Sequence, residues 1–347
     1  MKVLIITNMY PDKKDKAKGI FVKNLIDLLQ KDIKIDYSII PGSFIKNFFK
    51  GLKNTKRKIK EFNPDIIQGE YLVTGGLIAA LLKNFAKKPI LTTMRGSDIR
   101  IFPKGIIKKT IAKYCIKKAD CLVGWSNDLK KKVIELGADP GRVFVIPNGV
   151  DLKKFKIKDS KRTLRRKLKL PNGTITVFVG YVNKLKGIQD VIKPFSKLSK
   201  NNYLMIIGKG PIENELKEKA GKLGISNRIL FKGEINPEIL PKYLKSSDLM
   251  ILPTYSEGMP NIMLESMASG LPMILTKVGG IPDVATDENA LFHEPGSEEQ
   301  IYKSLKKMTE DSKLRQKLGK NNFKKIKDYT LEIRKKRFLD LYKRMVK

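Results

Sequence analysis

The stretch Pro253–Gly280 reads PTYSEGMPNIMLESMASGLPMILTKVGG. Pro260 suits the first turn of a helix, where its missing N–H is not needed, and Gly270 followed by Pro272 supplies stop signals. The apolar spacing between these punctuating residues is helical. The pattern therefore predicts a strand, a loop, a helix and a second strand in succession. The three regular elements span about 249–252, 261–269 and 272–275.

Two glutamates lie in this stretch, Glu257 in the loop and Glu265 on the first turns of the helix. The free backbone N–H groups of 258–262 attract an anion, by roughly 0.3–1 kcal/mol per charge. A carboxylate one turn further on can accept two hydrogen bonds from a ribose diol, and one in the loop can reach hydroxyls beyond the phosphates. The segment therefore fits a nucleotide-sugar. The alternative is that both glutamates are solvated surface charges.

Short apolar strands alternate with helices along both halves of the chain. This alternation predicts a parallel, doubly wound sheet in each half, with ligands bound at the carboxyl ends of the strands. The turn sequence Pro-Asn-Gly-Val-Asp at 147–151 marks the joint between two domains. We therefore expect one α/β domain over 1–150 and a second over 151–330.

The net charge of +36 comes from 71 Lys and Arg against 35 Asp and Glu. It is compatible with nucleic acid, an anionic membrane surface or anionic substrates, or with a compositional bias towards lysine. The lysines are spread over both halves and no helix-turn-helix, zinc-finger or RNA-binding motif accompanies them, so we predict no nucleic-acid partner. Cys115 and Cys121 form neither a disulfide framework nor a metal-ligand cluster. We expect a cytoplasmic protein without a metal site or a membrane span.

The segment 44–62, FIKNFFKGLKNTKRKIKEF, combines apolar and basic residues at helical spacing. A basic amphipathic helix with exposed aromatic residues binds the surface of an anionic membrane. The alternative is that its apolar face packs on the domain. Under the first interpretation the protein is peripheral on the inner face of the membrane.

The stretch Pro253–Gly280 closely resembles the donor-binding signature of the family 4 (group 1) retaining glycosyltransferases of the GT-B fold. The resemblance implies two Rossmann-like doubly wound domains facing across a cleft, with the final helix, 331–347, returning to the first domain. It also implies transfer of a hexose from a nucleotide-sugar, which is a substrate, to a saccharide or lipid-linked acceptor. Neither a metal nor a cofactor is expected.

Other motifs match the family with departures. Lys186 stands where the family has a lysine that holds the donor pyrophosphate, whereas Tyr181 replaces the usual arginine, a role that Lys184 or Arg95 can take over. Arg95 itself replaces a histidine of the family and cannot act as a base. It suits an anionic group, and the alternative is a structural pair with Asp98.

The resemblance and the residue chemistry together define the candidate site. As catalytic residues we expect Glu257, Lys186 and Arg95. The donor-binding residues are expected to be Gly19, Gly180, Lys184, Lys186, Gly208, Gly210, Gly233, Ile235, Glu257, Gly258, Met259, Pro260, Asn261, Ile262 and Glu265. The acceptor-binding residues are expected to be Gly96, Asp98 and Lys18.

The donor and the reaction each have alternatives. A UDP-sugar is favoured as the donor and GDP-mannose comes next, because the family reads the base largely through backbone groups. The alternatives to transfer are a sugar-nucleotide epimerase, a phosphorylase, or a non-catalytic nucleotide-sugar or membrane-binding protein. The single histidine, His293, is expected in a structural loop after the last strand, which disfavours the epimerase.

Overall fold

The computed structural model describes residues 1–11, 19–40, 42, 44–100 and 105–346, without the side chains of 97 and 100. The chain divides into two compact units. Unit 1 comprises Met1–Pro147 with Leu331–Lys347, and unit 2 comprises Asn148–Thr330. The division therefore falls after Pro147, at the start of the turn sequence that marks the expected joint.

Unit 1 is built on a six-stranded sheet of order β2-β1-β3-β4-β5-β6, in which every pair is parallel. The central strands are buried along their whole length, because helices cover both faces. The strands are β1 Lys2–Thr7, β2 Lys34–Ile39, β3 Ile66–Glu70, β4 Ile90–Thr93, β5 Cys121–Gly124 and β6 Val143–Val145.

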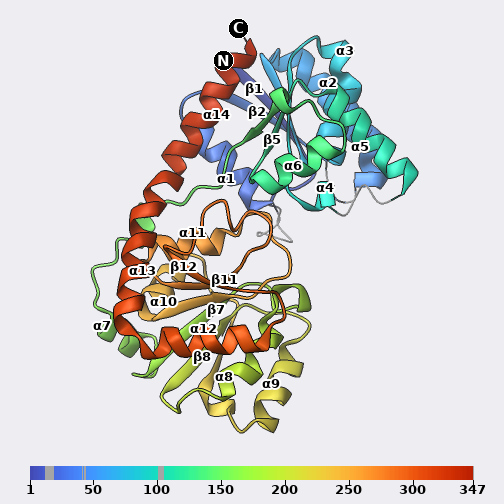
Figure 1. The fold of residues 1–347 in the computed structure, drawn as a ribbon. Coiled ribbons are helices and arrows are strands. Elements are labelled where there is room, and N and C mark those ends of the chain that lie inside the picture. The colour runs from blue at the N-terminus through green and yellow to red at the C-terminus, as the bar shows by residue number, and fades with distance from the viewer. Residues whose placement is uncertain (12–18, 41, 43, 101–104, 347) are drawn as a thin grey trace. The chain divides into compact units, whose positions relative to one another are not determined.

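The helices of unit 1 follow from the handedness of its crossovers. The step from β1 to β2 runs opposite to the later steps, so α1 covers the other face of the sheet from α2, α3 and α5. The final helix α14 packs beside α1 (Figure 1). Lys335 on α14 forms an ion pair of 2.9 Å with Asp32, which follows α1. The helices are α1 Ile20–Leu29, α2 Phe44–Phe62, α3 Gly76–Ala86, α4 Ser97–Arg100, α5 Ile106–Lys118, α6 Asn127–Glu135 and α14 Leu331–Val346, and the π-helix η1 Tyr71–Gly75 leads into α3.

Unit 2 repeats the same architecture with a parallel sheet of order β12-β11-β10-β7-β8-β9. Its strands are β7 Thr174–Val179, β8 Asn202–Ile207, β9 Ile229–Gly233, β10 Leu249–Leu252, β11 Met273–Thr276 and β12 Ala290–His293. Its helices are α7 Lys161–Lys167, α8 Ile192–Ser196, α9 Glu213–Lys222, α10 Leu240–Ser246, α11 Asn261–Ala268, α12 Glu298–Glu310 and α13 Ser312–Lys325. The predicted class, two doubly wound α/β domains, is confirmed.

The adjacency of β7 and β10 in this sheet has a direct consequence for the candidate site. Because carboxyl ends of parallel strands meet at one edge, the loop after β7 and the loop after β10 lie side by side. These loops carry Lys186 and Glu257. The order of the strands, which local sequence does not specify, therefore brings the two residues together.

Candidate functional site

Backbone contacts join the loop after β7 to the loop after β10. The carbonyl oxygen of Leu185 accepts hydrogen bonds from the backbone N–H of Tyr255 at 2.9 Å and from the hydroxyl of Thr254 at 3.1 Å. Gly187 adopts a left-handed φ of +71°, and a Cβ there would lie 2.0 Å from the carbonyl oxygen of Pro253. Only glycine allows this close approach.

Lys186 and Glu257 form an ion pair across these joined loops. Their side chains are 27% and 12% exposed, so the pair borders solvent while much of it is screened by protein. The hydroxyl of Tyr255 donates a 2.8 Å hydrogen bond to the carboxylate of Asp190, which ties the two loops together a second time. The result is an ammonium group and a carboxylate held in a defined position at the edge of the sheet.

The start of α11 lies next along the loop from this pair. Pro260 occupies the N-cap position, and no side chain of the described residues caps the first turn. The amide of Asn148 donates to the carbonyl of Met259 at 3.3 Å and to the side-chain oxygen of Asn261 at 3.0 Å. This contact positions the first turn, and its uncapped N–H groups form a site for an anion such as a phosphate.

Glu265 lies one turn into α11. Burial raises the pKa of its carboxyl to about 7, and the nearby Lys154 opposes this shift. A carboxylate with few protein partners in a desolvated position gains free energy when ligand hydroxyls donate to it. The arrangement therefore suits a diol beside an anion.

Glycines pack the loops at the ends of β7, β8 and β9 against one another. Gly208 has a φ of +126°, and a Cβ on it would lie 2.0 Å from the carbonyl oxygen of Gly180. Its N–H donates to the carbonyl of Gly233 at 2.7 Å, and Gly210 lies against Val182. Half-buried Ile235 follows this turn. Close backbone packing therefore fixes these loops, and their expected contact with the donor stays a prediction.

Tyr181, which stands in place of the family's arginine, and Lys184, which can take over its role, are both exposed to solvent. Tyr181 is 59% exposed, and the side chain of Lys184 is 73% exposed with its nearest ion-pair partner, Glu215, at 3.9 Å. An exposed pair at this distance contributes little. The proposed donor contact of Lys184 stays a prediction.

In unit 1 the guanidinium of Arg95 pairs with Glu70, whose side chain is completely buried, and only the backbone N–H of Arg95 bonds Asp98, the partner in the alternative. Its guanidinium also stacks on the rings of Phe21 and Trp125, 4.2 and 4.3 Å from their centroids. Arg95 is therefore held rigidly at the carboxyl end of β4. Arg95 belongs to unit 1 and Lys186 to unit 2, and each unit is described by itself. The catalytic role of Arg95 therefore stays a prediction.

Asp98 has a structural role. Its carboxylate accepts hydrogen bonds from the backbone N–H groups of Leu72, Arg95 and Gly96, each at 2.9 Å. Burial raises the pKa of Asp98 while these three donors lower it. Such a carboxylate holds η1 and the turn after β4 in place, and it leaves less capacity for an acceptor than the sequence implied.

The remaining predicted site residues of unit 1 divide between described and undescribed chain. Gly19 caps α1 with a φ of +62°, and a Cβ on it would lie 2.2 Å from the backbone of Met9. The left-handed conformation and the close contact with Met9 therefore require a glycine at position 19. Lys18, expected to bind the acceptor, lies outside the described residues.

The histidine and the cysteines are structural. His293 is the last residue of strand β12 and not part of a loop after the last strand, which corrects that expectation. Burial lowers its pKa, and its Nδ1 lies 2.9 Å from the carbonyl of Glu294. Burial raises the pKa of both Cys115 and Cys121 to about 12, so neither is a reactive thiolate. Within the described ranges no group of three His, Cys, Asp or Glu residues could hold a metal ion.

Sequence reasoning missed three participants, namely Asn148, Asp190 and Glu70. Asn148 belongs to the recognised turn at 147–151, so its motif was found but its contact with α11 was not. Asp190 and Glu70 carry no local signal, because a lone acidic residue at a helix start or strand end is common. Only the pairing of strands shows which loops they join.

Both halves of the chain match family models. Residues 2–154 match the model described as Glycosyltransferase Family 4, and residues 160–325 match the model described as Glycosyl transferases group 1.

Among curated relatives, the chain is 24% identical to a protein of Bacillus subtilis named as a glycosyltransferase of teichuronic acid biosynthesis, over 88% of each chain. It is 25% identical to the capsular polysaccharide biosynthesis glycosyltransferase CapM of Staphylococcus aureus, over 87% of this chain and 83% of that protein. Among solved structures, Anabaena HepE in complex with UDP superposes with a TM-score of 0.83 at 16% identity, over 99% of this chain and 100% of that one. The last likeness establishes the fold, GT-B.

Proposed function

The chain belongs to the family 4 (group 1) glycosyltransferases of the GT-B fold, and from this premise we propose that it moves a hexose from a nucleotide-sugar to a saccharide or lipid-linked acceptor with retention at the anomeric carbon. The observation that carries the proposal is the ion pair between Lys186 and Glu257, held beside the uncapped start of α11. Glu265, the open N–H groups at the start of α11 with Lys186, and Glu257 match in this order the ribose, the phosphates and the sugar of such a donor.

Each group has a role set by its position. The N–H groups at the start of α11 and the ammonium of Lys186 stabilise the charge that develops on the leaving phosphate. Glu265 accepts hydrogen bonds from the ribose diol. Glu257 accepts from hydroxyls of the transferred hexose and at the same time keeps Lys186 oriented.

The reaction breaks the bond from the anomeric carbon to the phosphate oxygen and forms a bond to the acceptor oxygen on the same face. The acceptor proton passes to the leaving phosphate oxygen. Retention through a covalent glycosyl-enzyme would need a second carboxylate placed across the bond. Glu257 is engaged by Lys186, which favours the direct route. Cations and backbone dipoles of the protein supply the electrostatic stabilisation in this proposal, so no metal is required.

The donor favoured is a UDP-sugar, with GDP-mannose as the second choice. The structural relative from Anabaena was solved with UDP, and its fold extends over nearly the whole of this chain. The two curated relatives are named for teichuronic acid and capsular polysaccharide biosynthesis, which supports an acceptor that is a growing glycan.

The rival GT-B reactions find less support in the geometry. An epimerase needs a base or acid near the sugar, whereas His293 is buried and its Nδ1 faces a backbone carbonyl. A phosphorylase remains distinguishable by its products, because it takes free phosphate as a co-substrate. The choice between transfer and phosphorolysis is therefore made by assay.

The test is a metal-free binding screen by thermal shift against UDP-, GDP- and ADP-sugars in the presence of EDTA. We expect one nucleotide class to stabilise the protein, by about 2.7 kcal/mol at a hundredfold excess over its Kd. Glu265→Ala should lose most of this stabilisation, whereas Glu310→Ala, at the end of the distant helix α12, should keep it. Equal stabilisation of both variants would refute the assignment of the donor site.

We also propose that α2 docks the protein on an anionic membrane surface. The apolar residues of α2 form two groups, one packed on the core and one exposed to solvent. Phe44, Phe48 and Leu52 pack against the core of unit 1, whereas Ile45 and Phe49 are 86% and 81% exposed. The packing interpretation therefore holds for the first group, and the exposure of the second group supports the membrane proposal.

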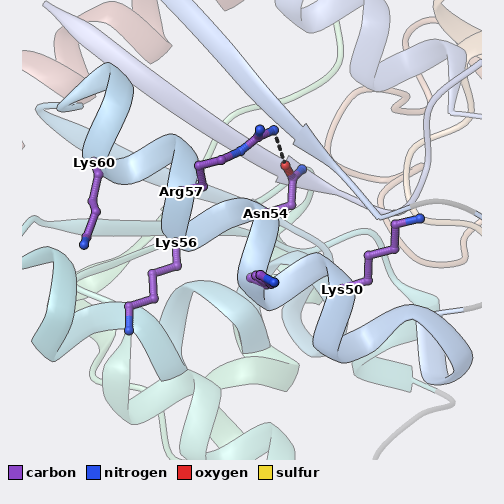
Figure 2. A pocket seen from close by; sticks show the side chains of 6 residues that line it. Lys50, Asn54, Lys56, Arg57 and Lys60 are labelled. Atoms are coloured by element: carbon purple, nitrogen blue, oxygen red, sulfur yellow. Dashed lines mark hydrogen bonds between the residues drawn. The ribbon is translucent and has the colours of Figure 1, made fainter.

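Several basic residues of α2 are exposed to solvent. Figure 2 shows cationic side chains spread along the helix, with Arg57 reaching the amide of Asn54 at 3.1 Å. They line a shallow cavity of about 520 Å³, formed by Lys50, Lys53, Asn54, Lys56, Arg57 and Lys60. Each cation near an anionic leaflet adds about 1 kcal/mol of attraction. No helix in the described parts of the chain is long and apolar enough to cross a membrane.

A further inference from the structure

Unit 1 buries two arginines beside one glutamate. Glu70, at the end of β3, is completely buried, and the side chain of Arg95 is 9% exposed. Arg334, on the final helix α14, is 7% exposed. The cluster therefore holds two positive charges against one negative charge away from bulk water.

Glu70 is hydrogen-bonded to Arg95, and no hydrogen bond among the described residues joins it to Arg334. One of its carboxylate oxygens accepts from Arg95, and the other accepts a 2.7 Å hydrogen bond from the amide of Gln68. Gln68 in turn accepts from the hydroxyl of Tyr342 on α14, at 2.5 Å. The hydrogen-bond chain ends there, and it does not include Arg334.

Three guanidinium nitrogens are buried without an acceptor among the residues that the structure describes. They are the Nε of Arg95 and the Nε and Nη2 of Arg334. Burial and the charge of Arg95 lower the pKa of Arg334 to about 9. A buried guanidinium is ordinarily paired with an anion and fully hydrogen-bonded.

Aromatic stacking compensates for only part of this loss. The guanidinium carbons of Arg95 and Arg334 lie 4.3 and 4.9 Å from the ring centroid of Trp125. Arg334 also lies 5.8 Å from the ring centroid of Phe338. A ring face attracts a cation but accepts no hydrogen bond along the N–H directions in the guanidinium plane. The in-plane donors still lack a partner within the described chain.

The cluster lies where ligands bind in this kind of fold. Glu70 ends β3, Arg95 follows β4 and Trp125 follows β5, so all three stand at the carboxyl edge of the sheet. Arg95 follows β4 directly at this edge, and Arg334 joins the cluster from α14. The edge of a parallel sheet thus ends in a set of oriented cationic donors.

We propose that Arg95 and Arg334 form a binding subsite for an oxyanion, a phosphate or carboxylate group carried by the acceptor. The fork of each guanidinium matches a planar or tetrahedral oxyanion, and the anion neutralises the excess positive charge of the cluster. That the oxyanion belongs to the acceptor rests on the proposed transferase function. The binding of an oxyanion by the two arginines does not.

Trp125 makes the subsite directly observable, because it is the only tryptophan of the chain. The experiment titrates inorganic phosphate, and separately acetate, at constant ionic strength and follows the emission of Trp125 in the full-length protein. We expect a saturable change with one or both anions. Phosphate without acetate would identify a tetrahedral oxyanion, and acetate without phosphate would identify a carboxylate.

Matched variants separate this subsite from the rest of the protein. Arg334→Met removes an unpaired buried charge and is expected to fold, whereas removal of Arg95 would strand Glu70 without its partner. Arg334→Met should weaken the anion response about tenfold or more. Arg337→Met, one turn away on the exposed side of α14, and Lys186→Met in unit 2 should each leave it within twofold.

Thermal unfolding gives a second, independent signature. Phosphate at ten times its Kd should raise the unfolding midpoint of unit 1 by about 3–6 °C in the wild type. Arg334→Met should unfold at or above the temperature of the anion-free wild type and should gain nothing from phosphate. An emission of Trp125 that is indifferent to both anions, or an equal response in Arg334→Met, would overturn the proposal.

A turnover assay tests the link to the acceptor. With an anionic acceptor, Arg334→Met should raise KM for the acceptor about tenfold and leave the Kd of the donor nucleotide unchanged. An anion response in Trp125 without donor binding by unit 2 would sink the proposed function but not the subsite. Normal transfer with an unchanged acceptor KM in Arg334→Met would exclude an acceptor role for the subsite.

Discussion

The ammonium of Lys186 contacts the carboxylate of Glu257, which lies 71 residues further along the chain. The two residues meet because β7 and β10 are neighbours in the sheet of unit 2, so that their following loops share one edge. An ion pair placed in this way is available to a ligand on one side and is fixed by backbone contacts on the other.

Removal of either member of the pair should impair turnover strongly. We expect Lys186→Ala to lower kcat by about 10²–10³, because one preorganised donor to the leaving phosphate is lost. Steady-state kinetics with the donor identified by thermal shift measures this loss. A matched change at Lys184, which is highly exposed, should cost less than fivefold if Lys186 alone serves the phosphate. Activity of Lys186→Ala within fivefold of the wild type would contradict the assignment.

Donor binding should depend on pH through Glu265. Its pKa of about 7 in the free protein means that the carboxyl is largely protonated below neutrality and cannot accept from both ribose hydroxyls. We expect the donor Kd to rise by up to about tenfold per pH unit below 7 and to be flat above it. Calorimetric titration from pH 5.5 to 8.5 measures the profile, and Glu265→Gln should remove the pH dependence.

The same group should affect stability with the opposite sign. The pKa is raised from 4.5 in the unfolded chain to about 7 in the folded protein, so the folded state binds more protons between these values. The contribution of Glu265 to stability is therefore fully present below pH 4.5 and is lost as the pH rises through 7. Glu265→Gln should be more stable than the wild type at pH 8 and lose this advantage near pH 4.5, measured by urea denaturation.

Gly187 and Gly224 provide a matched pair of substitutions. Both have left-handed φ values, +71° and +67°, so an alanine at either position is strained by about 1–2 kcal/mol. Only at Gly187 would the added Cβ also meet backbone, 2.0 Å from the carbonyl of Pro253, whereas at Gly224 there is open space among the described atoms. Gly187→Ala should therefore be the less stable variant and should also bind the donor more weakly. Equal unfolding free energies and equal donor affinity would show that the loop contact is unimportant.

Asn148 should influence phosphate binding through its contacts with the first turn of α11 and not through the sheet. Its amide donates to Met259 and to Asn261 at the first turn of α11. Loss of these hydrogen bonds in Asn148→Ala should raise the Kd of the nucleotide about 2–10-fold. Asn148→Asp should bind more weakly still, because a carboxylate repels both the Asn261 oxygen and the ligand phosphates. Tighter nucleotide binding by the Asn148→Asp variant than by the Asn148→Ala variant would contradict this geometry.

The exposed apolar residues of α2 allow a test of membrane docking. Ile45→Ser and Phe49→Ser combined should reduce binding to vesicles that contain anionic lipid, because two exposed apolar side chains no longer enter the interface. Co-sedimentation at low and physiological salt measures the change, with neutral vesicles as the comparison. The control is Leu223→Ser, which replaces a partly exposed apolar residue of unit 2 and should bind as the wild type does. Equal binding of both variants would attribute docking to charge alone.

The central segment was predictable because its information is local. Pro260 and Gly270 bracket a helical pattern, and the structure has α11 at Asn261–Ala268 between the expected strands. The basic helix at 44–62 was likewise visible in composition and spacing. What could not be foreseen was which of its apolar residues pack on the core, because Ile45 and Phe48 are both apolar and differ only in the side of the helix they occupy.

By itself, the sequence determined the doubly wound class, the turn and helix that carry Glu257 and Glu265, and the excess of positive charge, because each depends on residues close together in the chain. The tertiary structure decided which charges meet. Strand order pairs Lys186 with Glu257, the turn after β4 gives Asp98 to backbone N–H groups and Arg95 to Glu70, and the return of α14 to unit 1 places Arg334 beside Trp125. These partners are distant in sequence, and only the packing of strands and helices selects them from many equally charged residues.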